Sequence, residues 1–393
     1  MNPSDRRDSR RTVVAQVLML VTLSTGLLAC GLRSSQRSEQ TPPFVFRSLD
    51  LKQRGVDGLR SWDLQSPEAR YAVDSRTIRA RRPTGVLYRQ DQPSFRISAD
   101  LATVLNDGQL VVLEGSVELR QLDQRQLIIR GDRLVWTPGQ SQMVIDQNPR
   151  ALDATSQLRG EHLTFQVDQD TLTLQGSTLW DRWSDARSDI RRPDTTVTTQ
   201  DGRWNFVSGV MEAQGPVLMR RSEAETIQAS ALQGNTLRQE IDLMAPVTLT
   251  LPDGQGDLAT GTTRWHFGRQ QLVSQSDVIA KLRRGTVRGF GFTVDQRGKR
   301  VTIPSDCSLS QPGEQLTAQR CSWGWDDNQV VAEGNVVLRR AAMDQITRSP
   351  RLEGHLGEDG LIRFGAPGQR VTSTIKLKTP DATDSASPSR VSF

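Results

Sequence analysis

The chain has 393 residues, with 50 Lys or Arg, 45 Asp or Glu and a formal net charge of +5. Because the two signs are interleaved rather than clustered, the charge indicates a solvated surface and argues against a nucleic-acid-binding protein. Hydrophobic residues make up 35% of the chain and aromatic residues 5%, which is lean for a compact globular core. This composition favours thin β-layers separated by many turns.

Residues 1–30 have the features of a signal sequence or membrane anchor. Arginines at positions 6, 7, 10 and 11 precede an apolar run from Thr12 to Ala29. The segment Leu27-Leu28-Ala29-Cys30 has the form of a bacterial lipobox, which predicts acylation at Cys30. The apolar run is also long enough to span a bilayer uncleaved. Both alternatives place the following residues in the periplasm, anchored to the inner membrane, and polar residues 31–43 read as a tether.

The remaining two cysteines, Cys307 and Cys321, form an even pair in an oxidising compartment, which favours a disulfide. An antiparallel hairpin that turns near Pro312-Gly313 would set the two side chains opposite each other. Two unpaired buried thiols are the alternative.

Residues 78–89 show the period of two that is typical of strands. Ile78, Ala80, Val86 and Tyr88 share one parity and form the expected apolar face, whereas Leu87 falls among the arginines of the other parity. Arg82-Pro83 is expected to form a corner. Arg79, Arg81 and Arg82 could contact phosphate groups or simply form a solvated face.

A repeat organises the chain after residue 98. The stretch Ala99–Leu119, ADLATVLNDGQLVVLEGSVEL, returns 219 residues later as Ala318–Leu338, AQRCSWGWDDNQVVAEGNVVL, with eight of 21 positions identical. The units are about 30 residues long and can be aligned so that each begins with a small or polar residue, which we call its opener. The openers are Ala99, Gly131, Gly160, Thr199, Ala229, Thr260, Gly289 and Ala318. The residue five positions after each opener is apolar in most units. These residues form one column of the alignment: Val104, Trp136, Phe165, Trp204, Gly234, Trp265, Val294 and Trp323.

The repeat predicts an all-β fold. A unit of about 30 residues holds about three strands of typical length, and each unit would contact mainly its neighbours. We therefore expect an elongated β-jellyroll or β-taco, in which two antiparallel sheets face each other.

No pattern in the sequence indicates catalysis. His162, His266 and His355 are too far apart to suggest a metal site, and neither a phosphate-binding loop nor a nucleophile elbow is present. Asp326-Asp327 falls where the first repeat has a turn. We expect no enzyme, no metal and no cofactor. An apolar slot between two sheets would instead suit a lipid, although an ordinary packed core explains the same alternation.

Several segments resemble, in order and spacing, the LptC family, which is the membrane-anchored periplasmic component of lipopolysaccharide export. They are Phe44-Val45-Phe46, Gly58–Leu64, Ala69-Arg70-Tyr71, Pro83–Tyr88 and Phe95–Leu119. The endings Gly115–Leu119 and Gly334–Leu338 are similar to the signature of a wider fold family, which includes the bridge protein LptA and the N-terminal domain of the outer-membrane translocon. The resemblance covers residues 44–180, and the later units look like the same fold continued, as expected for a long cyanobacterial form.

This resemblance implies a passive conduit for lipopolysaccharide. An inner-membrane ABC transporter would supply the lipid, and an LptA-like bridge protein or the translocon N-terminal domain would receive it through strands added at the sheet edges. The residues expected to contact lipid are Ile78, Ala80, Val86, Tyr88, Val104, Val111, Leu113, Val117 and Leu119. The alternatives are an LptA-like or translocon-like bridge protein, and a non-catalytic periplasmic β-solenoid that binds polysaccharide.

The expected domain organisation follows from these patterns. Residues 1–30 form the signal sequence or anchor with its lipobox, 31–43 the tether and 44–180 the LptC-like β-jellyroll. Residues 181–194 form a polar insertion or hinge, 195–375 the continued β-jellyroll repeats and 376–393 a disordered tail.

Overall fold

The computed structural model describes residues 44–55, 57–187, 190–221, 225–251, 254–283, 285–355, 362–365, 368 and 370–375. These residues fall in one compact unit and contain 32 strands joined by antiparallel pairing into one sheet. The expected signal or anchor with Cys30, the tether and the tail lie outside the described residues. The all-β prediction is confirmed, since the only helices among the described residues are four 3-10 turns.

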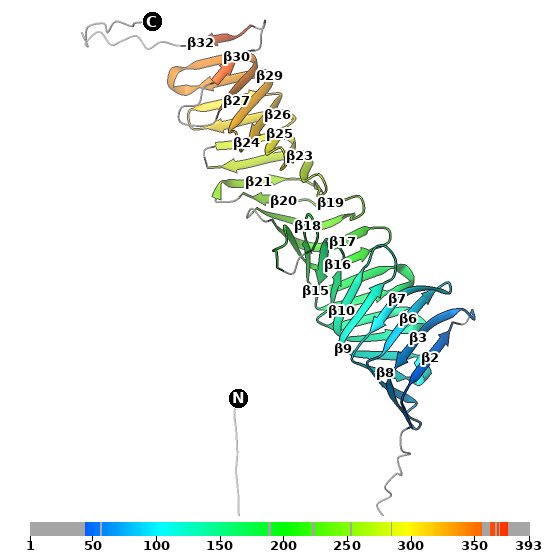
Figure 1. The fold of residues 1–393 in the computed structure, drawn as a ribbon. Coiled ribbons are helices and arrows are strands. Elements are labelled where there is room, and N and C mark those ends of the chain that lie inside the picture. The colour runs from blue at the N-terminus through cyan, green and yellow to red at the C-terminus, as the bar shows by residue number, and fades with distance from the viewer. Residues whose placement is uncertain are drawn as a thin grey trace, which may run out of the picture. The chain divides into compact units, whose positions relative to one another are not determined.

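The strands follow the chain in close succession (Figure 1). Those of the first half are β1 (Phe44–Phe46), β2 (Leu49–Arg54), β3 (Arg60–Ser66), β4 (Glu68–Ala72), β5 (Thr77–Arg81), β6 (Thr84–Arg89), β7 (Gln92–Ser98), β8 (Leu101–Leu105), β9 (Leu110–Gln121), β10 (Ile128–Thr137), β11 (Gln142–Gln147), β12 (Arg150–Leu152), β13 (Ser156–Arg159), β14 (His162–Gln166) and β15 (Thr171–Arg182).

Those of the second half are β16 (Thr195–Asn205), β17 (Val210–Arg221), β18 (Thr226–Asn235), β19 (Glu240–Leu243), β20 (Val247–Thr250), β21 (Gly256–Thr260), β22 (Thr263–His266), β23 (Gln271–Leu282), β24 (Gly285–Asp295), β25 (Arg300–Ile303), β26 (Ser305–Gln311), β27 (Glu314–Ala318), β28 (Arg320–Gly324), β29 (Gln329–Arg340), β30 (Gln345–His355), β31 (Ile362–Phe364) and β32 (Thr372–Thr374). The 3-10 turns are η1 (Asn106–Gly108), η2 (Pro138–Gln140), η3 (Val167–Gln169) and η5 (Ala341–Met343).

The pairing divides the sheet into two halves. In β9, residues 110–114 pair with β8 whereas residues 118–121 pair with β7. We call the half that contains the first part of β9 half-sheet A, and the half that contains the second part half-sheet B. The short strands of half-sheet A are β1, β4, β5, β8, β11, β14, β19, β22, β25, β28 and β31; those of half-sheet B are β2, β3, β6, β7, β12, β13, β20, β21, β26, β27 and β32. The other ten strands run through both halves.

A corner lets one strand serve both half-sheets. Five of the long strands, β9, β15, β17, β23 and β29, have 12 residues each. The pairing register shifts after the fourth residue in β23 and after the fifth residue in the other four. Gly115, Gly176 and Gly334 stand at this point with φ of 73°, 76° and 76°. Glycine adopts this left-handed conformation without a steric cost, so the strand bends there and continues in the other half-sheet.

The repeat of the sequence corresponds to one round trip of the chain. Each opener, such as Ala99 or Gly131, stands at or beside the corner where the chain crosses from half-sheet B to half-sheet A. The chain then turns at the far edge of half-sheet A, crosses back and turns at the far edge of half-sheet B. A unit thus contributes two passes through both halves. Some passes are one bent strand and others are two short strands, so a unit holds about three strands, as the sequence predicted.

The predicted column of apolar residues lies entirely in half-sheet A. Val111 pairs with both Val104 and Trp136, and Leu172 pairs with both Phe165 and Trp204. Directly paired residues of an antiparallel sheet share a face, so the column and the strands between its members form one continuous apolar row. Most of the buried side chains belong to one cluster that extends in sequence from Trp62 to Cys307, and a smaller cluster extends from Leu316 to Leu352.

The polar insertion does not interrupt the sheet. Asp181 and Arg182 are the last residues of β15, and β15 pairs with β16 from Thr171 opposite Asn205 to Arg182 opposite Thr195. The insertion is therefore a long connection at the far edge of half-sheet B.

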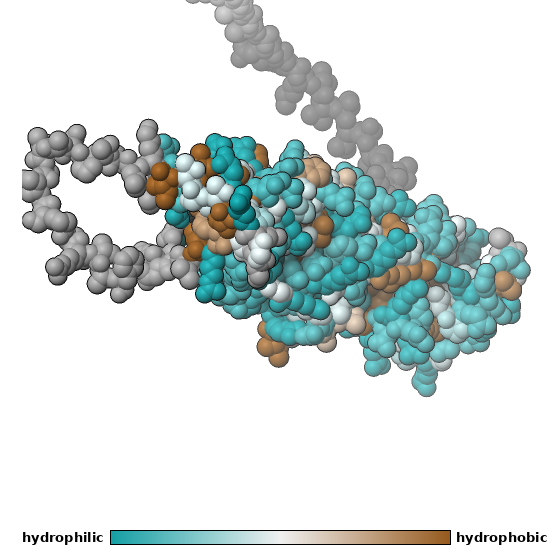
Figure 2. Space-filling view, turned by 90° about the horizontal axis from the view of Figure 1, so that it is seen from above, coloured by the Kyte–Doolittle hydropathy of each residue, from teal (hydrophilic) through white to brown (hydrophobic). Residues whose placement is uncertain are grey.

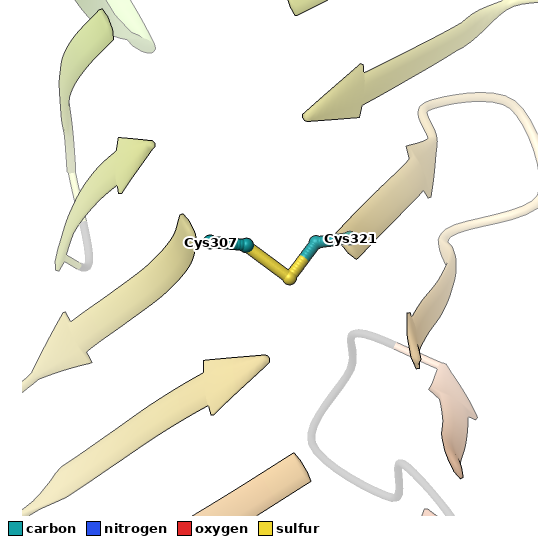
Figure 3. The surroundings of a disulfide bond; sticks show 2 residues. All are labelled: Cys307 and Cys321. Carbon is teal, nitrogen blue, oxygen red and sulfur yellow. A yellow bond between two sulfur atoms is a disulfide. The ribbon is translucent and has the colours of Figure 1, made fainter. Parts of the chain in front are cut away.

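The disulfide joins the two half-sheets. The hairpin of β26 and β27 turns at Pro312-Gly313, but Cys307 pairs with Ala318 rather than with Cys321. Cys321 belongs to β28 in half-sheet A, and its Sγ is bonded to Cys307 of β26 in half-sheet B (Figure 3). The bond therefore connects the facing sheets instead of two adjacent strands.

The parity expected for residues 84–88 is wrong. Gly85 and Leu87 are buried, whereas Val86 and Tyr88 are only partly buried and face outward. Arg82 has a φ of 45° and lies between β5 in half-sheet A and β6 in half-sheet B, so the chain changes sheets and the alternation restarts in a different phase.

The corner can be tested by replacing Gly115 with Ala. An added Cβ would lie 3.0 Å from Cβ of Asp100 and 2.5 Å from its Oδ2, and alanine would have to adopt a positive φ. We expect the free energy of unfolding to fall by about 1–3 kcal/mol. Chemical denaturation measures it, with Gly139→Ala as control because its Cβ would meet no atom within 4 Å. An equal effect of both substitutions would contradict the role of the corner.

Candidate functional site

The inner faces of the half-sheets meet through aromatic side chains. The ring centroids of Trp62 in β3 and Trp136 in β10 are 5.3 Å apart, and those of Phe95 in β7 and Phe165 in β14 are 5.4 Å apart. Further along the chain, Trp180 lies 6.2 Å from Trp265. Each pair joins half-sheet B to half-sheet A. The first two pairs meet edge-on, which is favourable for aromatic rings, and the third is tilted.

Most residues expected to contact lipid lie in this interior. Their exposed fractions are at most 2% for Ala80, Val104, Val111, Leu113, Val117 and Leu119. Ile78 is partly buried and packs against the same cluster. Val86 and Tyr88 lie on the outer face of half-sheet B, so they do not share a surface with the other seven.

A polar network holds Tyr88 on the outer face. Its hydroxyl donates to Asp63 Oδ2 over 2.8 Å, and the backbone N–H of Val86 donates to Asp63 Oδ1 over 2.9 Å. The guanidinium of Arg60 lies 4.5 Å from the centre of the Tyr88 ring. The hydrogen bond to Asp63, reinforced by burial, raises the pKa of Tyr88.

Opposite the corners, the described backbone does not run from one half-sheet to the other, and we call this side of the interior the mouth. On this side the connections of half-sheet A face those of half-sheet B, and four arginines of half-sheet B reach across. Arg89 donates to both carboxylate oxygens of Asp170, over 2.9 and 2.8 Å. Arg125 donates to the carbonyl oxygen of Phe206 over 3.1 Å.

Two further arginines continue this series. The guanidinium of Arg182 lies 4.3 Å from the centre of the Phe267 ring, and Arg221 donates to Oε1 of Gln296. Each of the four arginines lies at the end of a strand or in the following connection of half-sheet B. Together these contacts bridge the mouth at four places along the described sheet.

A cavity of about 340 Å³ opens at the mouth between two of these contacts. Its floor includes Leu158, Trp180, Trp204 and Met211, which are the apolar side chains of the interior. Arg125 and Arg182 line its rim, together with residues from the turn Asp153–Ser156 and the facing turn Thr236–Gln239. By contrast, a nearby interior void measures only about 20 Å³, so side chains fill most of the space between the sheets.

No pattern in the sequence indicated the mouth arginines. Each contacts a residue 75 or more positions later, and such a spacing depends on how the two half-sheets are offset. Only their place at strand ends could have drawn attention to them. Within the described residues, no group of His, Cys, Asp and Glu side chains is arranged to hold a metal ion.

The first part of the chain matches a known protein family. Residues 12–179 match the family described as Lipopolysaccharide-assembly, LptC-related. These residues, which we call the LptC-related part, are similar to that family. The family acts in lipopolysaccharide transport as a non-catalytic component that is periplasmic and associated with the inner membrane. A comparison with curated proteins finds no match.

The LptC-related match ends within β15, whereas the fold does not. β15 continues to Arg182 and pairs with β16, and the same corners and inward rows recur as far as β30. The chain therefore extends the β-jellyroll of the LptC-related part with further units of the same construction.

The contact between facing sheets can be measured with Phe95 and Phe165. Replacing the fully buried Phe165 with Ala should lower the free energy of unfolding by about 3–5 kcal/mol. In a double-mutant cycle with Phe95→Ala, the coupling energy should be about 0.5–1.5 kcal/mol. Thr164→Ala, which alters the neighbouring outward residue, is the control. A coupling energy of zero would mean that the two rings do not support each other.

The network around Tyr88 predicts its titration. Because the folded state holds the phenolic proton more tightly than the unfolded state, its contribution to stability is present below pH 10 and is lost at higher pH. In a Tyr71→Phe background, ultraviolet absorbance should show Tyr88 ionising above the ordinary value of about 10. Asp63→Asn should move this titration downward. An unchanged titration in that variant would contradict the assignment.

Proposed function

We propose that this chain is a component of the lipopolysaccharide transport bridge that holds the acyl chains of the lipid between its two half-sheets. The observation that carries the proposal is the apolar interior, which continues through the LptC-related part and through the later units. The sugars of the lipid would remain outside, in water. No group in this arrangement needs to perform chemistry, because the task is to shield hydrocarbon from water.

Lipid entry requires the half-sheets to separate, since aromatic and aliphatic side chains fill the interior. The corners keep the halves covalently continuous, so the separation would occur at the mouth. The bridging contacts there are modest: the ion pair of Arg89 with Asp170, whose side chains are 40% and 14% exposed, contributes on the order of 1 kcal/mol. Burial of an acyl chain gains roughly 0.8 kcal/mol per methylene. A chain of about twelve carbons therefore gains on the order of 9 kcal/mol, which exceeds the cost of opening several contacts.

The ends of the sheet suit strand addition. Phe44 and Val45 of β1 are 58% and 62% exposed, and β1 pairs on one side only, with β4. β32 likewise pairs only with β30. An inner-membrane ABC transporter component would join the first end, and an LptA-like bridge protein or translocon domain the other, each by backbone hydrogen bonds to these strands.

Anchoring to the inner membrane, by acylation of Cys30 or by an uncleaved apolar segment, is part of the same proposal. Within the part of the chain that the structure describes, no helix is long and apolar enough to cross a membrane. Mass spectrometry of the mature N-terminus distinguishes the two anchors, because an unprocessed Met1 is incompatible with acylation at Cys30.

Photo-crosslinking in cells tests whether lipid occupies the interior. A photo-reactive amino acid at Val117, or at Leu249 in the later units, should trap lipopolysaccharide, because both positions are at most 2% exposed and face inward. Arg79 and Thr250, which face outward, are the matched controls. Adducts only at the controls would overturn the proposal, and adducts at Val117 without any at Leu249 would restrict it to the LptC-related part.

A further inference from the structure

The mouth cavity combines an apolar surface with a positively charged one. Its floor is the apolar interior, and its rim carries the guanidinium groups of Arg125 and Arg182. The 340 Å³ volume is large enough for part of an acyl chain but not for a whole lipid. A ligand that fits both surfaces has hydrocarbon at one end and negative charge at the other.

Among the described residues, no carboxylate lies within ion-pair distance of either guanidinium group. Many arginines of the described part lie within 4 Å of a carboxylate, as Arg89 does with Asp170 and Arg264 with Asp242. Arg125 instead donates to a backbone carbonyl, and Arg182 stacks on the Phe267 ring. Burial lowers the pKa of Arg182, against a smaller opposing influence of Asp153 and Asp194. Asp153 accepts hydrogen bonds from the backbone N–H groups of Thr155 and Ser156.

Both arginines also hold the mouth closed, which links ligand binding to opening. Each crosses from half-sheet B to a connection of half-sheet A. An anionic group offers a guanidinium stronger, charge-assisted hydrogen bonds than a carbonyl or an aromatic ring does. A ligand that captured the two guanidinium groups would release Phe206 and Phe267 and expose the apolar floor between them.

We propose that this cavity is a lateral portal for an acylated ligand with a phosphorylated headgroup, in which Arg125 and Arg182 bind the phosphates while an acyl chain enters over Trp180 and Trp204. This inference rests on the proposed function, and it names the place on the mouth where the lipid is recognised. The portal is built from both the LptC-related part and the later units, because Arg125 lies within the match and Arg182 lies beyond it.

The test compares ligands and variants of the full-length protein. Equilibrium binding of diphosphoryl lipid A is measured for the unaltered chain, for R125Q/R182Q and for R96Q/R203Q. The last variant removes the same charge from two exposed arginines on outward positions of β7 and β16. R125Q/R182Q should raise the Kd at least tenfold, whereas R96Q/R203Q should leave it unchanged. R125Q/R182K should bind more tightly than R125Q/R182Q, because lysine retains the positive charge at position 182.

Ligand controls identify the source of the negative charge. Lipid A without its phosphates should bind R125Q/R182Q and the unaltered chain equally. Inorganic phosphate at millimolar concentration should not displace diphosphoryl lipid A; displacement would show a site for free anions and overturn the portal. Equal losses in both double variants would also overturn it, since they would indicate a general effect of charge.

Failure of the portal can be told apart from failure of the proposed function. If Val117 still traps lipopolysaccharide but R125Q/R182Q binds lipid A normally, the portal is wrong and the conduit stands. If no interior position traps lipid, both are wrong. Thermal unfolding of R125Q/R182Q checks that a loss of binding does not come from a loss of folding, and the partial rescue in R125Q/R182K gives a second check.

Discussion

The bend within a single strand is the constraint on which the rest of this structure depends. Because a strand such as β9 turns at Gly115 and continues, its two parts belong to facing sheets that share one continuous backbone. The bend fixes one edge of the interior, so that edge cannot open. At the opposite edge, connections join the strands within each half-sheet. There, the described residues of the two half-sheets are held together by side-chain contacts. The difference between a closed corner and an openable mouth follows from this local geometry.

The packing adds a second asymmetry. Aromatic pairs such as Phe95 with Phe165 bring the half-sheets together inside, while arginines such as Arg89 join them at the mouth. The inner contacts are apolar and could be exchanged for contacts with acyl chains at little cost. The outer contacts are polar and exchange readily with water or with an anionic group. Figure 2 shows one face of the protein as mostly hydrophilic, with apolar residues exposed in scattered patches. Among the described residues, the buried hydrophobic side chains outnumber the exposed large ones. The apolar surface is thus concentrated in the interior, where a lipid would use it.

Much of the fold could be predicted from the sequence, because the corner and the inward column leave periodic traces. Openers such as Gly131 mark the corner, and Trp136 and Trp204 mark the inner face. The same reasoning failed at Val86 and Tyr88. The chain changes sheets at Arg82, so the alternation of inward and outward residues before this corner does not continue after it. It could not find the mouth arginines at all. Their partners are set by the offset between facing sheets, which local patterns do not encode.

The central claim is that the mouth separates when lipid enters while the corner stays fixed. Spin labels at Leu122 and Val207, on opposite sides of the mouth, would report this distance by pulsed electron paramagnetic resonance in a Cys30→Ser background. A second pair at Ser116 and Ser177 would report the corner. Addition of lipopolysaccharide should lengthen or broaden the distance across the mouth and leave the corner pair unchanged. An unaltered mouth distance, in protein shown to have bound lipid, would contradict the account.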